Sequence, residues 1–176
     1  MTEERTNKKQ ADAEIKTFPV PFSLDGLKEI FTINTKNYTQ DYKEKIINQA
    51  LKSHSEGNIP EAVKYYQYFI NQGFKDHRVF SNYGVILTNL GKLKEAELST
   101  REAIKLKPNL AEAHSNLGSL LKDLGKLQEA ELSLRKAIEI KPDYAEAYAN
   151  LGNVLRNLGE LHEAELSLKK AIEIQP

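Results

Sequence analysis

The sequence contains no cysteine among its 176 residues. Disulfide bonds, thiolate nucleophiles and cysteine-ligated zinc are therefore excluded. Neither sign of charge is in excess, because 25 lysines and arginines stand against 25 aspartates and glutamates. Proteins that bind nucleic acid or other polyanions carry a basic excess, so the balance argues against that class and against attachment to a membrane surface.

Long apolar stretches are also missing. No run of the sequence approaches the roughly 20 apolar residues that a helix needs to cross a bilayer. The chain opens on Met1–Arg5, a mostly polar stretch without the apolar segment of a secretory signal. Because the lack of cysteine also fits a reducing compartment, we expect a cytoplasmic protein that makes no contact with a membrane.

What the sequence does contain is an internal repeat. The segment Leu90–Ser99 recurs almost unchanged as Leu124–Ser133 and Leu158–Ser167, each time 34 residues later. Three prolines keep the same step: Pro108, Pro142 and Pro176. A degenerate earlier copy retains Ala62 in register but has Phe74 in place of the proline.

The landmarks of this repeat resemble those of the tetratricopeptide repeat, which has 34 residues and a fixed order of bulky, small and proline positions. In the third copy the landmarks are His114, Leu117, Gly118, Leu121, Ala130, Leu134, Ala137 and Pro142. The resemblance covers residues 43–176. The near-identical copies beside a degenerate first one are similar to bacterial, especially cyanobacterial, arrays. The resemblance implies an all-α fold, an α-solenoid of antiparallel helix pairs with a right-handed superhelical twist, and a protein-interaction scaffold without cofactor or catalytic activity.

Six segments follow from the repeat and from composition. We expect a disordered polar tail over 1–17, an extension over 18–42 that covers the first repeat, a degenerate repeat over 43–76, and repeats over 77–110, 111–144 and 145–176 without a C-terminal capping helix. Two interpretations of Phe18–Phe22 stay open, a docking motif for a partner or a cover for the first repeat. We favour the cover, because terminal repeats need one.

Helix ends are predicted from local signals. Gly125 lies where a left-handed residue ends the first helix of the third repeat, and Pro142 ends the second helix. Three pairs resemble capping boxes: Asn58 with Glu61, Asn109 with Glu112, and Asp143 with Glu146.

An asparagine occupies the same position of the first helix in every copy. These residues are Asn48, Asn82, Asn116 and Asn150. In the family this position faces the concave groove, and the pattern is similar to the asparagine ladder in the repeat arm of O-linked N-acetylglucosamine transferase. An amide both donates and accepts, so the ladder would hold an extended peptide by its backbone. The alternative is that each amide only satisfies local hydrogen bonds.

Further residues complete the predicted groove: Ser81, Ser115, Ser119, Asn153, Asn89, Lys122 and Arg156. A second family binding mode, the carboxylate clamp for acidic C-terminal tails, needs cations at the second position of the first helices. This sequence has Glu44, Arg78, Glu112 and Glu146 there. Three carboxylates would repel an acidic tail, so we predict no such clamp.

Two sets of apolar residues are expected at the surface. Leu98, Leu132 and Leu166 lie about 200° around the second helix from the core alanine and form a possible interface on the convex side. The last repeat would expose parts of Leu161, Leu168, Ile172 and Ile174. Such an end favours two alternatives to a stand-alone scaffold. One is the recognition arm of a larger glycosyltransferase- or sulfotransferase-like enzyme, and the other is self-association through this end.

Catalytic and metal sites are not predicted. The four histidines, His54, His77, His114 and His162, share no metal-ligand spacing and have no recognisable carboxylate partner. His114 stands where neighbouring copies have Phe80 and Tyr148, so we expect it to pack in the core.

Overall fold

The computed structural model describes residues 40–175. The predicted tail, almost all of the predicted extension including Phe18–Phe22, and Pro176 lie outside the described residues. The described part is entirely helical, which confirms the all-α prediction. Its helices are α1 (Gln40–Ser55), α2 (Ile59–Asn71), α3 (His77–Asn89), α4 (Leu93–Leu106), α5 (Ala111–Asp123), α6 (Leu127–Ile140), α7 (Ala145–Leu158) and α8 (Leu161–Ile174).

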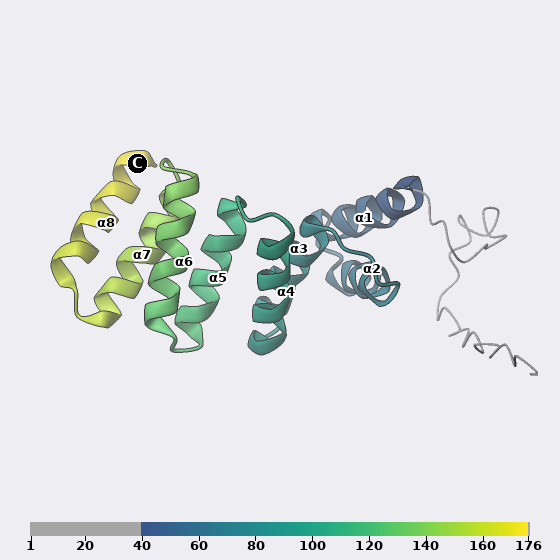
Figure 1. The fold of residues 1–176 in the computed structure, drawn as a ribbon, viewed down its shortest axis with the longest axis horizontal. Coiled ribbons are helices and arrows are strands. Elements are labelled where there is room, and N and C mark those ends of the chain that lie inside the picture. Colours follow the sequence, from purple (N-terminus) through teal and green to yellow (C-terminus); the bar gives the residue numbers. More distant parts are fainter. Residues whose placement is uncertain (1–39, 176) are drawn as a thin grey trace, which may run out of the picture. The chain divides into compact units, whose positions relative to one another are not determined.

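Consecutive helices form antiparallel pairs, and the pairs stack in chain order from α1–α2 to α7–α8 (Figure 1). We call the odd-numbered helices A helices and the even-numbered ones B helices. Successive A helices approach each other within 8 Å between Cα atoms, whereas no two B helices do within residues 40–175. The stack is therefore tighter on the A side, which is the arrangement of an α-solenoid, and grooves can open between B helices.

The turn from α5 to α6 shows how the sequence ends an A helix. Gly125 has φ of 74°, a left-handed conformation that a side chain would disfavour. The N–H of Gly125 donates to the carbonyl of Lys122 at 3.0 Å, and that of Lys126 donates to Leu121 at 2.8 Å. These two bonds are a Schellman motif, so the predicted role of Gly125 is confirmed.

Of the three predicted capping boxes, one forms in part: Asn58 caps α2, but Glu61 reaches the side-chain amide of Asn58 and not its backbone N–H, which donates to Ser53. The Asn58 side chain accepts from the backbone N–H of Glu61 at 3.4 Å, and its amide donates to the Glu61 carboxylate at 2.7 Å. Asp76 provides a cap that was not predicted, because its carboxylate accepts from the N–H of Arg78 at 2.8 Å.

The capping boxes assigned to Asn109 and Asp143 are wrong. Helices α5 and α7 begin at Ala111 and Ala145, and their N-cap residues, Leu110 and Tyr144, make no side-chain cap bond. Leu110 and Tyr144 are partly buried. Both helices therefore start one residue beyond the polar candidates, after a residue that does not cap them.

The degenerate first unit replaces the usual proline with an aromatic anchor. Phe74 is buried and packs edge-on against Phe69 and Tyr42, with ring centroids 5.2 and 6.3 Å apart. The Tyr42 hydroxyl lies 2.7 Å from that of Tyr68. Tyr42 packs against this core, and α1 already begins at Gln40, before the predicted start of the repeat at residue 43.

Candidate protein-interaction surfaces

The four repeated asparagines lie on the A helices, and their amides are not equally free. Asn48 is exposed, while Asn82, Asn116 and Asn150 are partly buried. The Asn82 amide donates to the carbonyl of Arg78 in its own helix at 2.9 Å. Within residues 40–175 the other three amides make no hydrogen bond, so both functions of each amide are open to a partner.

Arg78, the one cation at the clamp position, is already neutralised. Its guanidinium donates to Glu44 of α1 at 2.7 Å and to Asp76 at 2.9 Å. Hydrogen bonds to Asp76 and then to Glu44 raise the Arg78 pKa above its usual range. Burial alone would raise the pKa of Asp76, but the bonds from Arg78 outweigh it and the net shift is downward. An acidic tail would have to displace two carboxylates to reach this cation.

The N-terminal ends of α5 and α7 carry negative charge. The Tyr144 hydroxyl donates to the Glu146 carboxylate at 3.2 Å. Burial raises the pKa of Tyr144 to about 12, and the charges of Glu146 and Glu112 add to the effect. At the opposite ends of the same helices lie Lys122 and Arg156, so the asparagines stand between an acidic and a basic row.

Most of the other predicted groove residues reach the surface. Ser81, Ser119, Asn153 and Lys122 are partly buried, and Asn89 and Arg156 are exposed. The prediction that Ser115 lines the groove is wrong, because its side chain is fully buried at 0% exposure. It precedes Asn116 and is therefore turned about 100° around the helix, toward Tyr144 of the next unit. It is not available to a partner.

The apolar candidates are exposed to different degrees. Leu98, Leu132 and Leu166 are 72%, 68% and 53% exposed. On α8, Leu161 and Ile172 are 65% and 66% exposed. Leu168 and Ile174 are partly buried. Their part in an interface stays a prediction.

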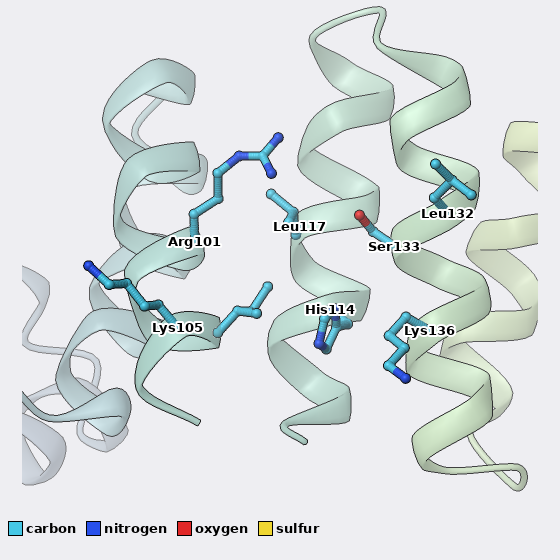
Figure 2. A pocket seen from close by; sticks show the side chains of 8 residues that line it. Arg101, Lys105, His114, Leu117, Leu132, Ser133 and Lys136 are labelled. Carbon is cyan, nitrogen blue, oxygen red and sulfur yellow. The ribbon is translucent and has the colours of Figure 1, made fainter. Parts of the chain in front are cut away.

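A groove that sequence reasoning missed lies between the B helices α4 and α6. Its volume is about 390 Å³. Figure 2 shows Arg101 and Lys105 of α4 on one side, Leu132 and Lys136 of α6 on the other, and His114 of α5 between them. We call it the α4–α6 groove. The missed signal was a histidine at a position that is aromatic and larger in two neighbouring copies.

His114 is accordingly not the core residue that was predicted. It is only partly buried. Its Nε2 donates to the carbonyl of Pro108 at 2.9 Å, which holds the ring against the start of its own helix. Its ring is smaller than the phenylalanine and tyrosine that occupy this position in the neighbouring repeats.

Within the described residues, no group of three or more histidines or carboxylates could hold a metal ion. In the same part of the chain, every helix is too short or too polar to span a bilayer.

Solved structures of similar fold include MamA and YrrB. The chain is similar to the crystal structure of MamA, with a TM-score of 0.73 and 21% identity over 86% of this chain and 83% of that one. It is also similar to YrrB, described as a TPR protein with an unusual peptide-binding site. The TM-score is 0.69, and the identity is 25% over 76% of this chain and 69% of that one. A MamA structure from Desulfovibrio magneticus RS-1 is also similar, with a TM-score of 0.68 and 23% identity over 76% of each chain.

Family comparison agrees with the fold. A TPR repeat profile matches residues 118–159, and tetratricopeptide repeat profiles match 77–110 and 145–176. No curated protein matches the chain. The matched segments, the paired helices and the structural neighbours agree, and the chain belongs to the tetratricopeptide-repeat family.

Proposed function

We propose that this chain is a protein-interaction scaffold that binds an extended peptide segment of a partner across its A helices. Asn48, Asn82, Asn116 and Asn150 would hold the peptide backbone. The observation that carries the proposal is the state of Asn116 and Asn150, which occupy equivalent positions in successive A helices. Both are partly buried, and neither amide has a hydrogen-bond partner among residues 40–175. The amide atoms of both residues are not among the buried unpaired atoms of residues 40–175, so they still reach solvent, where a peptide backbone would replace water as their partner.

The surroundings of the asparagines favour a particular kind of peptide. Arg78 is paired and Glu112 and Glu146 lie at one edge, so an acidic tail would meet repulsion there. A neutral or basic segment fits this edge better. YrrB, described as having an unusual peptide-binding site, is a structural neighbour at 25% identity and supports a peptide ligand for this fold.

Asn116→Ala/Asn150→Ala tests the proposal on an array of extended peptides. Two amides can form two to four hydrogen bonds with a backbone, so we expect peptide capture to weaken about tenfold or more. The matched control is Asn71→Ala, an exposed asparagine at the end of the B helix α2. Circular dichroism would verify that all variants stay helical.

The proposal fails if the parent protein captures no peptide, or if the double variant binds as well as the parent. It also fails if Asn71→Ala loses as much binding as the double variant. The predicted cytoplasmic location and bacterial origin stay predictions from the sequence. The same is true of a role as the recognition arm of a larger enzyme, on which residues 40–175 have no bearing.

A second candidate function, self-association, rests on the face of α8. Leu161 and Ile172 are 65% and 66% exposed. Their equivalents in the preceding unit, Leu127 and Ile138, are only partly exposed because α7 lies against α6. The face of α8 therefore has the apolar character of an internal repeat interface, and a second copy of the chain could cover it.

A further inference from the structure

The α4–α6 groove has an apolar floor and a positively charged rim. Ile104, Leu117 and Leu132 provide the apolar surface. Arg101, Lys105 and Lys136 surround it, and the residues that line the groove include no carboxylate (Figure 2). The groove opens between B helices and is thus separate from the asparagines of the A helices.

Its depth follows from one residue. His114 stands at the position of Phe80 in the second repeat and Tyr148 in the fourth. The imidazole is smaller than either ring, and its bond to Pro108 keeps it at the base of the groove. A tyrosine at this position is compatible with the fold, since the fourth repeat carries one.

Its charge is also particular to this repeat junction. Lys105 corresponds to Asn71 in the first repeat and to Glu139 in the third. The equivalent surface between α6 and α8 therefore has a carboxylate where the α4–α6 groove has an ammonium group. Apolar residues recur at every junction, so the charge pattern distinguishes this one.

The two lysines are available to a ligand. Lys105 is 73% exposed and lies 3.7 Å from Glu102, and Lys136 pairs at 2.7 Å with Glu139, which is 69% exposed. Exposed pairs of this kind contribute only about 0–1 kcal/mol and exchange readily. Arg101 is held more firmly, by Glu97 at 2.9 Å and by Glu129 of α6 at 2.8 Å. It therefore forms a fixed side of the groove and is not counted as a ligand-binding cation.

We propose that the α4–α6 groove binds an acidic segment of a partner protein that carries a large apolar side chain. The apolar side chain lies against Ile104, Leu117 and Leu132 in the space left by His114. Carboxylates on either side of it bind Lys105 and Lys136. Burial of the apolar group contributes affinity, and the charges select acidic over neutral or basic segments.

The test uses a short fluorescein-labelled peptide with glutamates around a central Leu-Phe pair, measured by fluorescence polarisation. We expect His114→Tyr, which fills the space, and Lys105→Glu, which copies Glu139, each to weaken binding about tenfold or more. The same peptide with glutamine in place of every glutamate should bind the parent protein as weakly as the acidic peptide binds these variants. Asn116→Ala/Asn150→Ala should leave binding unchanged, which separates this surface from the proposed function.

Three results would overturn the proposal. The first is no binding of the acidic peptide by the parent, or equal binding of the glutamine peptide. The second is that the asparagine double variant loses binding while His114→Tyr keeps it, which would place the peptide on the A helices. The third is a change in oligomeric state with Lys105→Glu, which would identify a second copy as the occupant. Circular dichroism on each variant separates loss of binding from loss of fold.

Discussion

Two buried serines show how differently one residue type can serve this fold. Ser99 is 7% exposed, and its hydroxyl donates to the carbonyl of Phe80 at 2.9 Å, which ties α4 to α3. Ser53 is 1% exposed and occupies the position of Leu87 in the next repeat. Within residues 40–175 the Ser53 hydroxyl has no hydrogen-bond partner.

These environments predict opposite effects of alanine. Ser99→Ala removes an interhelical hydrogen bond and should lower the free energy of unfolding by about 1 kcal/mol. Ser53→Ala removes an unpaired buried hydroxyl and should leave that free energy unchanged or raise it. Urea denaturation monitored by circular dichroism measures both. Equal losses in the two variants would contradict the assignment of their hydroxyl partners.

Gly118 is needed for close packing rather than for a turn. A Cβ there would collide with the Cγ of Leu134, and it would lie 2.9 Å from Leu134 Cδ2 and 3.1 Å from the Ala130 carbonyl. Alanine is favoured over glycine inside a helix by about 1 kcal/mol, whereas overpacking costs about 1–3 kcal/mol. We therefore expect Gly118→Ala to lower stability despite its better helix propensity.

The control for Gly118→Ala is the same change in a Leu134→Ala background. That background removes the side chain that a Cβ would meet and leaves only the approach to the Ala130 carbonyl at 3.1 Å, so the added methyl should destabilise much less. Thermal unfolding of the four proteins gives the coupling between the two sites. If Gly118→Ala costs as much without Leu134 as with it, the collision is not the reason.

At the scale of helices, ion pairs bridge elements whose backbones do not approach one another. Arg101 of α4 bonds Glu129 of α6 at 2.8 Å, and Lys126, which precedes α6, bonds Glu97 of α4 at 2.9 Å. Between α6 and α8 the bridge is Arg135 to Glu163, at 2.8 Å. The side chain of Glu97 is the least exposed partner, at 15%. These contacts tie neighbouring B helices together on the side where the stack is looser.

The Glu97 bridge predicts a dependence of stability on pH. The hydrogen bond from Lys126, followed by that from Arg101, lowers the pKa of Glu97 below its ordinary 4.5 in the folded state. Its contribution is therefore complete above about pH 4.5 and is lost as the pH falls through the lower folded-state value. Glu97→Gln should remove part of the acid destabilisation that the parent shows below pH 4.5.

Denaturant midpoints measured between neutral and acidic pH check this expectation. The matched control is Glu95→Gln, because Glu95 only approaches Lys92 at 3.9 Å in an exposed pair. It should lose stability in acid much as the parent does. A Glu97→Gln profile parallel to that of the parent would contradict a role for this bridge.

At the scale of the whole stack, the two ends of the described helices differ. On α1, Lys45, Gln49 and Lys52 occupy positions at which α3 has buried Val79, Tyr83 and Ile86. These positions make the outer side of α1 polar. The α8 end is apolar at Leu161 and Ile172. Stacking of α8 on a polar α1 is unfavourable, so an association between copies would join two α8 faces.

Leu161→Glu/Ile172→Glu tests this association. We expect the parent to form dimers as its concentration rises and the double variant to remain monomeric, because charges would be buried in a symmetric contact. Sedimentation velocity over a range of concentrations gives the measurement. Leu90→Glu, at an exposed leucine that belongs to neither candidate interface, is the control and should dimerise like the parent. A monomeric parent, or dimers in the double variant, would exclude contact through α8.

Much of this architecture follows from local and periodic features of the sequence. The 34-residue period predicts the helix pairs, and glycine at 125 predicts the end of α5, because both depend on backbone geometry and on residues close in the chain. The repeated asparagines could be located on A helices in the same way. What those amides bind stays a prediction, because amide chemistry alone does not name a partner.

Tertiary structure decided the features that depend on neighbouring units. Ser115 is fully buried although it stands beside Asn116 on the same helix, and the N-cap of α5 is Leu110, which makes no side-chain cap bond, in place of the predicted Asn109. The α4–α6 groove combines His114, which is smaller than its counterparts Phe80 and Tyr148, with side chains of two B helices whose backbones stay apart. Such outcomes depend on the volumes of side chains brought together across the stack, which a repeat pattern read along one chain does not specify.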